Sequence, residues 1–257
     1  MADGIQGLPL AGLIAIVFSA TFLVTLGIYL VVTALAVGDR ARAFKAFSPG
    51  MLPPMGLLFA LLVGFMAAQI WSEAGRAQDA VDREASALRS VILLAEGFPD
   101  ATERFDALVE RQIRTAVDEE WPAMAQQRAT LTVVAAPLAE ALQLAIGLSP
   151  GTDGERTAQR ELVDAVQDAL DARRQRIIVS ETSLNWVKWT GVILVALLTL
   201  IAIAFVHSDN RLTAKLALGV FAAAVATSLT LLAAQERPFS GQFAVEPDVL
   251  LQVQPEP

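Results

Sequence analysis

The residues that could do chemistry in this 257-residue chain are few, and most lie between residues 73 and 185. Asp118, Glu119 and Glu120 are three adjacent carboxylates, which could bind a hard cation through oxygen ligands. No ligand-spaced loop of the EF-hand kind accompanies them, so a solvated acidic helix end is the competing interpretation. His207 is the only histidine and the chain has no cysteine. We therefore expect no metal, no cofactor and no enzymatic activity.

Arginines form the second candidate site. Arg173, Arg174 and Arg176 would attract anions if they faced a vestibule, and Arg173 and Arg176 are the anion-attracting candidates. They could equally pair with carboxylates of neighbouring helices. An earlier group of charged residues is typical of ordinary ion pairs on a helix surface: Asp79, Asp82, Glu84, Arg76 and Arg83.

Four long apolar segments must position these charges. Each reaches the roughly 18 apolar residues that a membrane-spanning helix needs: residues 8–37, 53–71, 186–206 and 214–234. The first and second are joined by a short connection, as are the third and fourth, so both termini and residues 72–185 are expected on one side of the bilayer. Trp71, Trp186 and Trp189 would then share one interface, as an aromatic belt does.

The second apolar segment could do more than span the membrane. Ala60, Gly64 and Ala68 form a ridge of small residues, which predicts close packing within one subunit or, alternatively, a pore between subunits. The spans carry no charged residue at mid-depth, which disfavours a proton-coupled carrier. The pore-lining candidates are Phe59, Gly64, Phe65 and Met66.

Residues 72–185 are expected to form an extramembrane helical domain. From residue 73 to residue 185 there are 12 arginines and no lysine against 20 acidic residues, a net charge of −8, so nucleic acid is excluded as a partner. Apolar residues recur there at three- and four-residue steps. Breaks are expected at residues 98–100, at Trp121-Pro122 and at residues 149–154, with one helical stripe from Met124 to Ile146. In the tail, residues 235–257, we expect Pro247 to Pro257 to be disordered.

The predicted fold is therefore an all-α membrane protein. It has four transmembrane helices, and a four-helix extramembrane bundle is inserted in the sequence between the second and the third. Two helices of this bundle, the first and the last, are expected to be continuous with the second and third transmembrane helices.

The distribution of basic residues gives an expected orientation. The two short connections carry Arg40, Arg42, Lys45, Arg211 and Lys215, which by the positive-inside rule places them in the cytoplasm and the helical domain in the periplasm. Arginines of the domain that lie near membrane ends oppose this orientation. Arg outnumbers Lys 16 to 3 and Ala is abundant, which is typical of a high-GC bacterial genome and predicts a multi-pass protein of the bacterial inner membrane.

Several short motifs, taken in order, resemble a bacterial bestrophin-like family of unknown function. They are Val81-Asp82-Arg83-Glu84-Ala85, Glu120-Trp121-Pro122, the arginines from Arg173 to Arg176, and Pro238-Phe239-Ser240-Gly241. The motif positions carried over are Glu84, Glu120, Trp121, Pro122, Pro238, Phe239 and Gly241.

The resemblance implies a channel. Bestrophins are pentameric anion channels in which the second transmembrane helix lines a hydrophobic neck. Their helical domain is cytoplasmic, which conflicts with the orientation above, and their acidic calcium clasp has no clear counterpart here. Our hypothesis is a homo-oligomeric channel for anions or small ions whose partners are the lipid bilayer, small ions and further copies of the chain. The alternative is a non-conducting sensor or scaffold whose helical domain binds a ligand or protein.

Overall fold

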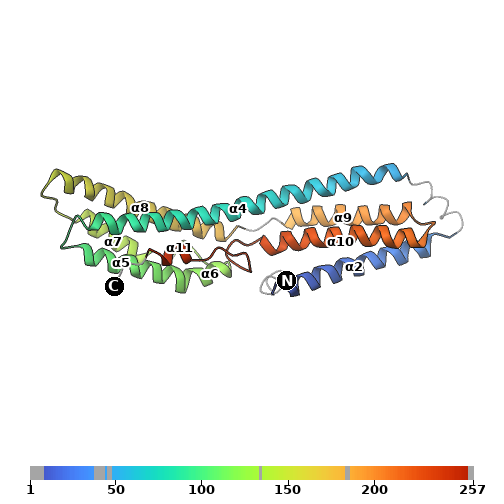
Figure 1. Cartoon of the computed structure of the whole chain (residues 1–257), viewed down its shortest axis with the longest axis horizontal. Coiled ribbons are helices and arrows are strands. Elements are labelled where there is room, and N and C mark those ends of the chain that lie inside the picture. The colour runs from blue at the N-terminus through green and yellow to red at the C-terminus, as the bar shows by residue number, and fades with distance from the viewer. Residues whose placement is uncertain (1–8, 38–43, 45–47, 133–134, 183–185, 254–257) are drawn as a thin grey trace. The chain divides into compact units, whose positions relative to one another are not determined.

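A computed structural model describes residues 9–37, 44, 48–132, 135–182 and 186–253, and every regular element within these ranges is a helix (Figure 1). The helices divide into two compact units, each described by itself below. Unit 1 comprises Met1–Trp71 and Ser183–Glu236, and unit 2 comprises Ser72–Thr182 and Arg237–Pro257. The elements are α2 (Leu10–Leu35), the 3-10 turn η1 (Pro49–Met51), α4 (Leu52–Ala95), α5 (Thr102–Thr115), the π-helical turn η2 (Ala116–Glu120), α6 (Trp121–Ala125), α7 (Ala136–Ile146), α8 (Asp153–Ser180), α9 (Trp186–Val206), α10 (Arg211–Gln235) and α11 (Asp248–Leu251).

Among the described residues, four helices are long and apolar enough to cross a membrane, as the sequence predicts; unit 1 contains α2, α9, α10 and the part of α4 up to Trp71. α9 has the predicted bounds, and α10 begins three residues earlier than expected because Asn210 caps it, accepting from the backbone N–H groups of Leu212 and Thr213. Buried threonines within the spans donate their hydroxyl groups to the carbonyl four residues earlier. No polar hydroxyl of these threonines is left unsatisfied, which a hydrocarbon environment demands.

One end of unit 1 is held by polar side chains. The indole N–H of Trp71 donates to Gln235 at 2.7 Å, and that of Trp189 donates to Glu236 at 3.2 Å. Lys188 donates to Gln69. Residues 69–71 of α4, the start of α9 and the C-terminal end of α10 therefore lie together, as the predicted aromatic belt requires.

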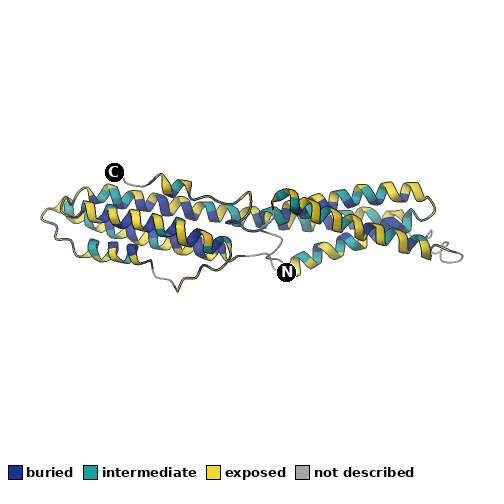
Figure 2. Ribbon diagram, turned by 90° about the horizontal axis from the view of Figure 1, so that it is seen from below, coloured by how far each residue is buried: buried dark blue, intermediate teal, exposed yellow. Residues whose placement is uncertain are grey.

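Unit 2 is built on the second half of α4 with α5, α7 and α8, each of which buries one stripe (dark blue in Figure 2). Apolar residues at helical spacing form its core, with Val81, Leu88, Phe105 and Leu162 fully buried. α8 begins with a capping box, in which the Thr152 hydroxyl accepts from the Glu155 N–H while the Glu155 carboxylate accepts from the Thr152 N–H.

One of the two predicted continuities is confirmed. α4 runs for 44 residues from Leu52 to Ala95, about 66 Å at 1.5 Å per residue, which is roughly twice the hydrocarbon thickness of a bilayer. The other prediction differs from the structure, because α8 ends at Ser180 and α9 is a separate helix that begins at Trp186. Residues 183–185 and the basic residues Arg40, Arg42 and Lys45 lie outside the described residues.

The predicted break at Trp121-Pro122 is wrong. The chain stays helical from Thr102 to Ala125, since a π-helical turn carries it into Trp121 and Pro122 occupies the first turn of α6. The helix ends after Ala125 instead, and α7 does not begin until Ala136. Residues from Met124 to Ile146 are therefore not one helix, and the side chains of Leu131 and Ile146 are exposed.

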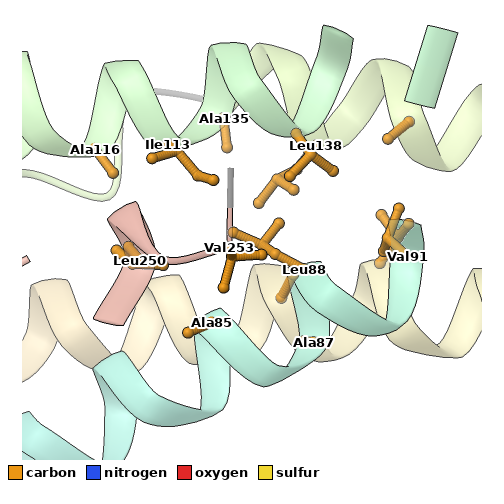
Figure 3. Close-up of a cluster of buried hydrophobic side chains, with 14 of the residues drawn as sticks. Ala85, Ala87, Leu88, Val91, Ile113, Ala116, Ala135, Leu138, Leu250 and Val253 are labelled. Carbon is orange, nitrogen blue, oxygen red and sulfur yellow. The ribbon is translucent and has the colours of Figure 1, made fainter. Parts of the chain in front are cut away.

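The prediction that the tail is disordered is also wrong for the part that the structure describes. Residues 248–251 form α11, and Leu250 and Val253 are buried in the core of unit 2. Figure 3 shows Val253 beside Leu88 of α4, with Leu250 in the same cluster on the side of Ala85 and Ala116. The C-terminal segment is thus part of the domain core, although the sequence places it after the last span.

Gly241 permits the turn that leads into this segment. Its φ is 87°, a left-handed conformation in which a side chain is disfavoured by about 1–2 kcal/mol. We expect Gly241→Ala to destabilise the protein by that amount in thermal unfolding of the purified chain. The control is Gly75→Ala in α4, where an added methyl group meets no atom within 4 Å and helix propensity favours alanine by up to about 1 kcal/mol. Equal melting temperatures of Gly241→Ala and Gly75→Ala would contradict the assignment of a left-handed backbone requirement to Gly241.

Candidate functional site

Four charged side chains meet inside unit 2. Glu84 lies on α4, Glu120 ends the π-helical turn η2, and Arg173 and Arg176 lie one turn apart on α8. Their exposed fractions are 0% for Glu84 and Arg176, 6% for Arg173 and 8% for Glu120. We call these four residues the buried charge cluster. Its two positive and two negative charges balance.

The cluster is closed by short, directed bonds. The Nε of Arg176 lies 2.6 Å from Oε2 of Glu84, and its terminal nitrogen NH2 lies 3.1 Å from Oε1 of Glu84 and 2.7 Å from Oε2 of Glu120. Arg173 donates to Oε1 of Glu120 through Nε at 2.7 Å and lies within 2.6 Å of it through NH2. Arg176 therefore bridges α4 to η2, and Glu120 bridges the two arginines.

Apolar and aromatic groups complete the surroundings of Arg176. Its guanidinium carbon lies 4.6 Å from the centre of the Trp121 ring, and NH1 lies 3.5 Å from the sulfur of Met124. Burial alone would lower the pKa of Arg176, but the two carboxylates outweigh it and raise the pKa above its ordinary value. The guanidinium is therefore charged at every physiological pH, and the cluster is a permanent electrostatic link between three segments.

The π-helical turn explains how Glu120 reaches the cluster. Asp118, Glu119 and Glu120 are adjacent, yet only Glu120 is buried while Asp118 and Glu119 are exposed. The wider i→i+5 turn also precedes Pro122, which has no N–H to donate to a carbonyl of the preceding turn. The turn thus accommodates the proline and aims one carboxylate of the three inward. Among the described residues no group of three His, Cys, Asp or Glu could hold a metal ion.

The motif Pro238-Phe239-Ser240-Gly241 packs against Trp121, next to the buried charge cluster. The ring of Phe239 meets the ring of Trp121 edge-on at 5.7 Å, and Pro238 is buried beside it. The indole N–H of Trp121 donates to the carbonyl of Val245 at 3.0 Å, and the N–H of Val245 donates to the carbonyl of Pro238 at 2.8 Å. Trp121 therefore connects the buried charge cluster to the C-terminal segment.

The structure revises three sequence-based interpretations. Arg173 and Arg176 do not face an open vestibule, because their guanidinium groups are buried against Glu84 and Glu120, which is the alternative pairing with neighbouring helices. Glu84 is not a surface ion-pair residue, since its partner Arg176 is 92 residues away in the sequence. The acidic helix end is solvated only at Asp118 and Glu119.

Sequence reasoning missed Gln112 altogether. Gln112 is fully buried on α5, and its Nε2 lies 3.4 Å from Oε1 of Glu84. It occupies a core position of the stripe formed by Leu108, Val109 and Ile113. The sequence does contain a signal for this residue: a polar side chain at an apolar position of a helical stripe indicates a buried hydrogen-bond partner.

The carboxyl group of Asp106, on α5, has a raised pKa. One of its oxygens is buried and accepts no hydrogen bond from the described residues, and burial, reinforced by Glu96, raises its pKa above 3.8. Ionisation then disfavours the folded state, so this contribution to stability is present at low pH and is lost as the pH rises through the folded pKa. We expect Asp106→Asn to raise the melting temperature at pH 7 and to have no such effect below pH about 3.8, where the carboxyl is protonated in both states.

The pore-lining candidates do not share one face of α4. Phe59 and Met66 are buried in the core of unit 1, where Phe59 meets Phe221 of α10 at 5.6 Å. Gly64 is exposed, and the ring of Phe65 is 65% exposed. Ala60 and Ala68 lie on the exposed face too, so no described residue of the same chain covers the small-residue ridge. We call the exposed side chains of Leu57, Ala60, Leu61, Gly64, Phe65 and Ala68 the free face of α4.

The structure is that of an all-helical membrane protein. It has four described apolar helices of spanning length and a helical unit whose segments are joined by the buried charge cluster. The profile of the family described as the Bestrophin-like domain matches residues 19–250. The chain belongs to this bestrophin-like family.

Solved structures agree with this fold. A mutant of a bacterial bestrophin homologue from Klebsiella pneumoniae superposes with a TM-score of 0.69 at 11% identity, covering 94% of this chain and 96% of that chain. A mutant described as a membrane protein gives a TM-score of 0.66, also at 11% identity, over 94% and 96% of the two chains. Comparison with curated protein sequences gives no significant match.

Proposed function

We propose that this protein is a homo-oligomeric channel for anions or small ions in a bacterial inner membrane, with α4 lining the path. The observation that carries the proposal is the free face of α4. It is apolar, it contains the small-residue ridge, and an added methyl group at Gly64 would meet no atom within 4 Å. A face of this kind either contacts lipid or meets further copies of the chain.

Family membership favours the second possibility. The resemblance to bestrophins implies a neck lined by the second transmembrane helix, and α4 contains the second apolar segment of this chain. Of the four pore-lining candidates, Gly64 and Phe65 lie on the free face and are kept as path residues. Phe59 and Met66 are assigned to packing within unit 1. An apolar ring at Phe65 would form the kind of hydrophobic constriction that gates by dewetting.

Electrical recording tests the proposal directly. Purified full-length protein is placed in planar bilayers under a potassium chloride gradient, and native mass spectrometry gives the number of copies in mild detergent. We expect currents that protein-free bilayers lack, a reversal potential that reports the sign of the preferred ion, and more than one copy per particle. A monomer without conductance under every ion gradient would overturn the proposal and favour the non-conducting sensor or scaffold.

The orientation of the chain is a separate proposal. The basic residues in or next to the two short connections, with Arg211 and Lys215 in the first turns of α10, favour a cytoplasmic location for these connections and a periplasmic one for unit 2. The chain has no cysteine, so single cysteines can be placed at the exposed positions Asp118 in unit 2 and Asp209 between α9 and α10. We expect a membrane-impermeant maleimide to label Asp118→Cys in intact spheroplasts and Asp209→Cys only after permeabilisation. The reverse pattern would place unit 2 in the cytoplasm.

A further inference from the structure

A groove in unit 2 carries a charge opposite to that of the domain around it. It lies between α4 and α8 and has a volume of about 730 Å³. Its charged and amide side chains are Arg76, Arg83 and Glu73 from α4 and Asp171, Arg174 and Gln175 from α8. Three arginines face two carboxylates here, whereas residues 73–185 together carry a net charge of −8. We call this feature the arginine groove.

The arginines of the groove are incompletely paired within the described part of the chain. Arg76 meets Glu73 at 3.5 Å, with 62% of its side chain exposed. Arg83 is exposed and uses its Nε to donate to the backbone carbonyl of Asp79, and no described carboxylate forms an ion pair with it. Arg174 forms no ion pair within 4 Å of a described carboxylate.

The contrast with the neighbouring arginines is informative. Arg173 and Arg176 lie on the buried face of α8 and are saturated by Glu84 and Glu120, whereas Arg174 lies on the exposed face of the same helix. Successive residues of a helix are rotated by about 100°, so Arg174 points away from the buried charge cluster. The groove arginines are therefore available to a ligand without disturbing the core.

Guanidinium groups bind phosphate through paired N–H donors, and they do so more strongly where several converge. Arg76 and Arg83 are seven residues apart on one face of α4, about 10.5 Å along the helix, and Arg174 comes from the opposite wall. Arg76 follows Trp71, the last residue of the apolar span, by five residues of the same helix, which is about 7.5 Å. This distance corresponds to the headgroup layer of a bilayer.

We propose that the arginine groove is a binding site for a phosphate group, supplied by the headgroup of an anionic phospholipid or by free phosphate. Arg83 and Arg174 hold the phosphate, and Arg76 contacts it from the membrane side. The site stands independently of the channel proposal, because binding is measured on the purified protein without any current.

The test compares the groove arginines with matched arginines outside it. The affected variants are Arg174→Gln and the double variant Arg83→Gln with Arg174→Gln. The controls are Arg89→Gln on α4 and Arg160→Gln on α8, which remove the same charge from exposed positions outside the groove. Two arms are run on full-length protein in neutral detergent: calorimetric titration with inorganic phosphate, and native mass spectrometry after addition of phosphatidylglycerol or phosphatidylcholine.

We expect the wild-type chain to bind in at least one arm. The single variant should lose about tenfold in affinity and the double variant more, with both controls unchanged. Retention of phosphatidylglycerol over phosphatidylcholine without inorganic phosphate binding assigns the site to a lipid, and the opposite result assigns it to free phosphate. Absence of binding in both arms, or equal losses in the groove and control variants, would overturn the proposal.

Discussion

Replacing Glu84 by glutamine is expected to lower the free energy of unfolding by about 3–5 kcal/mol. The substitution keeps the shape of the side chain and removes one of the two negative charges of the buried charge cluster. Arg176 then keeps only Glu120, which Arg173 already shares, so a buried positive charge is left uncompensated. Thermal or denaturant unfolding of the purified chain, followed by circular dichroism, measures the loss.

Two further variants make this result specific. Glu119→Gln removes the same charge from an exposed position beside Glu120 and should change stability by less than about 0.5 kcal/mol. Glu84→Gln combined with Arg176→Gln restores neutrality and should be less destabilising than the sum of its two single variants. Indistinguishable unfolding of Glu84→Gln and Glu119→Gln would show that the cluster does not hold unit 2 together.

Replacing Trp121 by alanine is expected to destabilise the protein by about 3–5 kcal/mol and to release the C-terminal segment. The indole is 9% exposed, packs on Phe239 and Arg176, and donates to Val245, so its removal leaves a cavity where α6 meets that segment. Protease should then remove a C-terminal epitope tag faster than from the wild-type chain.

The expected rank order of three variants checks the role of each part of the indole. Trp121→Phe keeps one aromatic ring and loses the N–H donor together with the second ring of the indole, so its effect should be intermediate. Trp186→Ala, at a tryptophan that is 74% exposed, should leave both stability and tag release unchanged. Unaltered protection of the tag in Trp121→Ala would contradict the connection between Trp121 and the C-terminal segment.

The apolar spans were predictable because the bilayer imposes a length and a composition that a single sequence displays. Within the described residues, the helix α9 has the bounds of the third apolar segment, and the continuation of α4 beyond Trp71 followed from an uninterrupted helical stripe. The π-helical turn was not predictable, because Trp121-Pro122 also has the composition of a helix break. The order of the tail was not predictable either, because Leu250 and Val253 fill a core position of unit 2 that forms only when α4, α5 and α7 pack together.

The buried charge cluster was only partly predictable, because its bonds join residues 53 to 92 positions apart. Glu84 has acidic and basic neighbours at helix spacing, so local reasoning favoured a surface pair. Its register gives the better signal, because Glu84 follows Val81 by three residues and precedes Leu88 by four, which places it on the core face of α4. Arg173 and Arg176 share the register of Val166 and Ala169 on α8 in the same way.

The central claim is that the free face of α4 lines an ion path, and accessibility of single cysteines during recording tests it most directly. Phe65→Cys and Phe59→Cys lie on the same helix, one on the free face and one buried against α10, and no native cysteine interferes. We predict that a small, charged methanethiosulfonate reagent changes the current of Phe65→Cys channels and leaves Phe59→Cys channels unaffected. A reagent that leaves both currents unchanged, or alters both to the same extent, would contradict the claim.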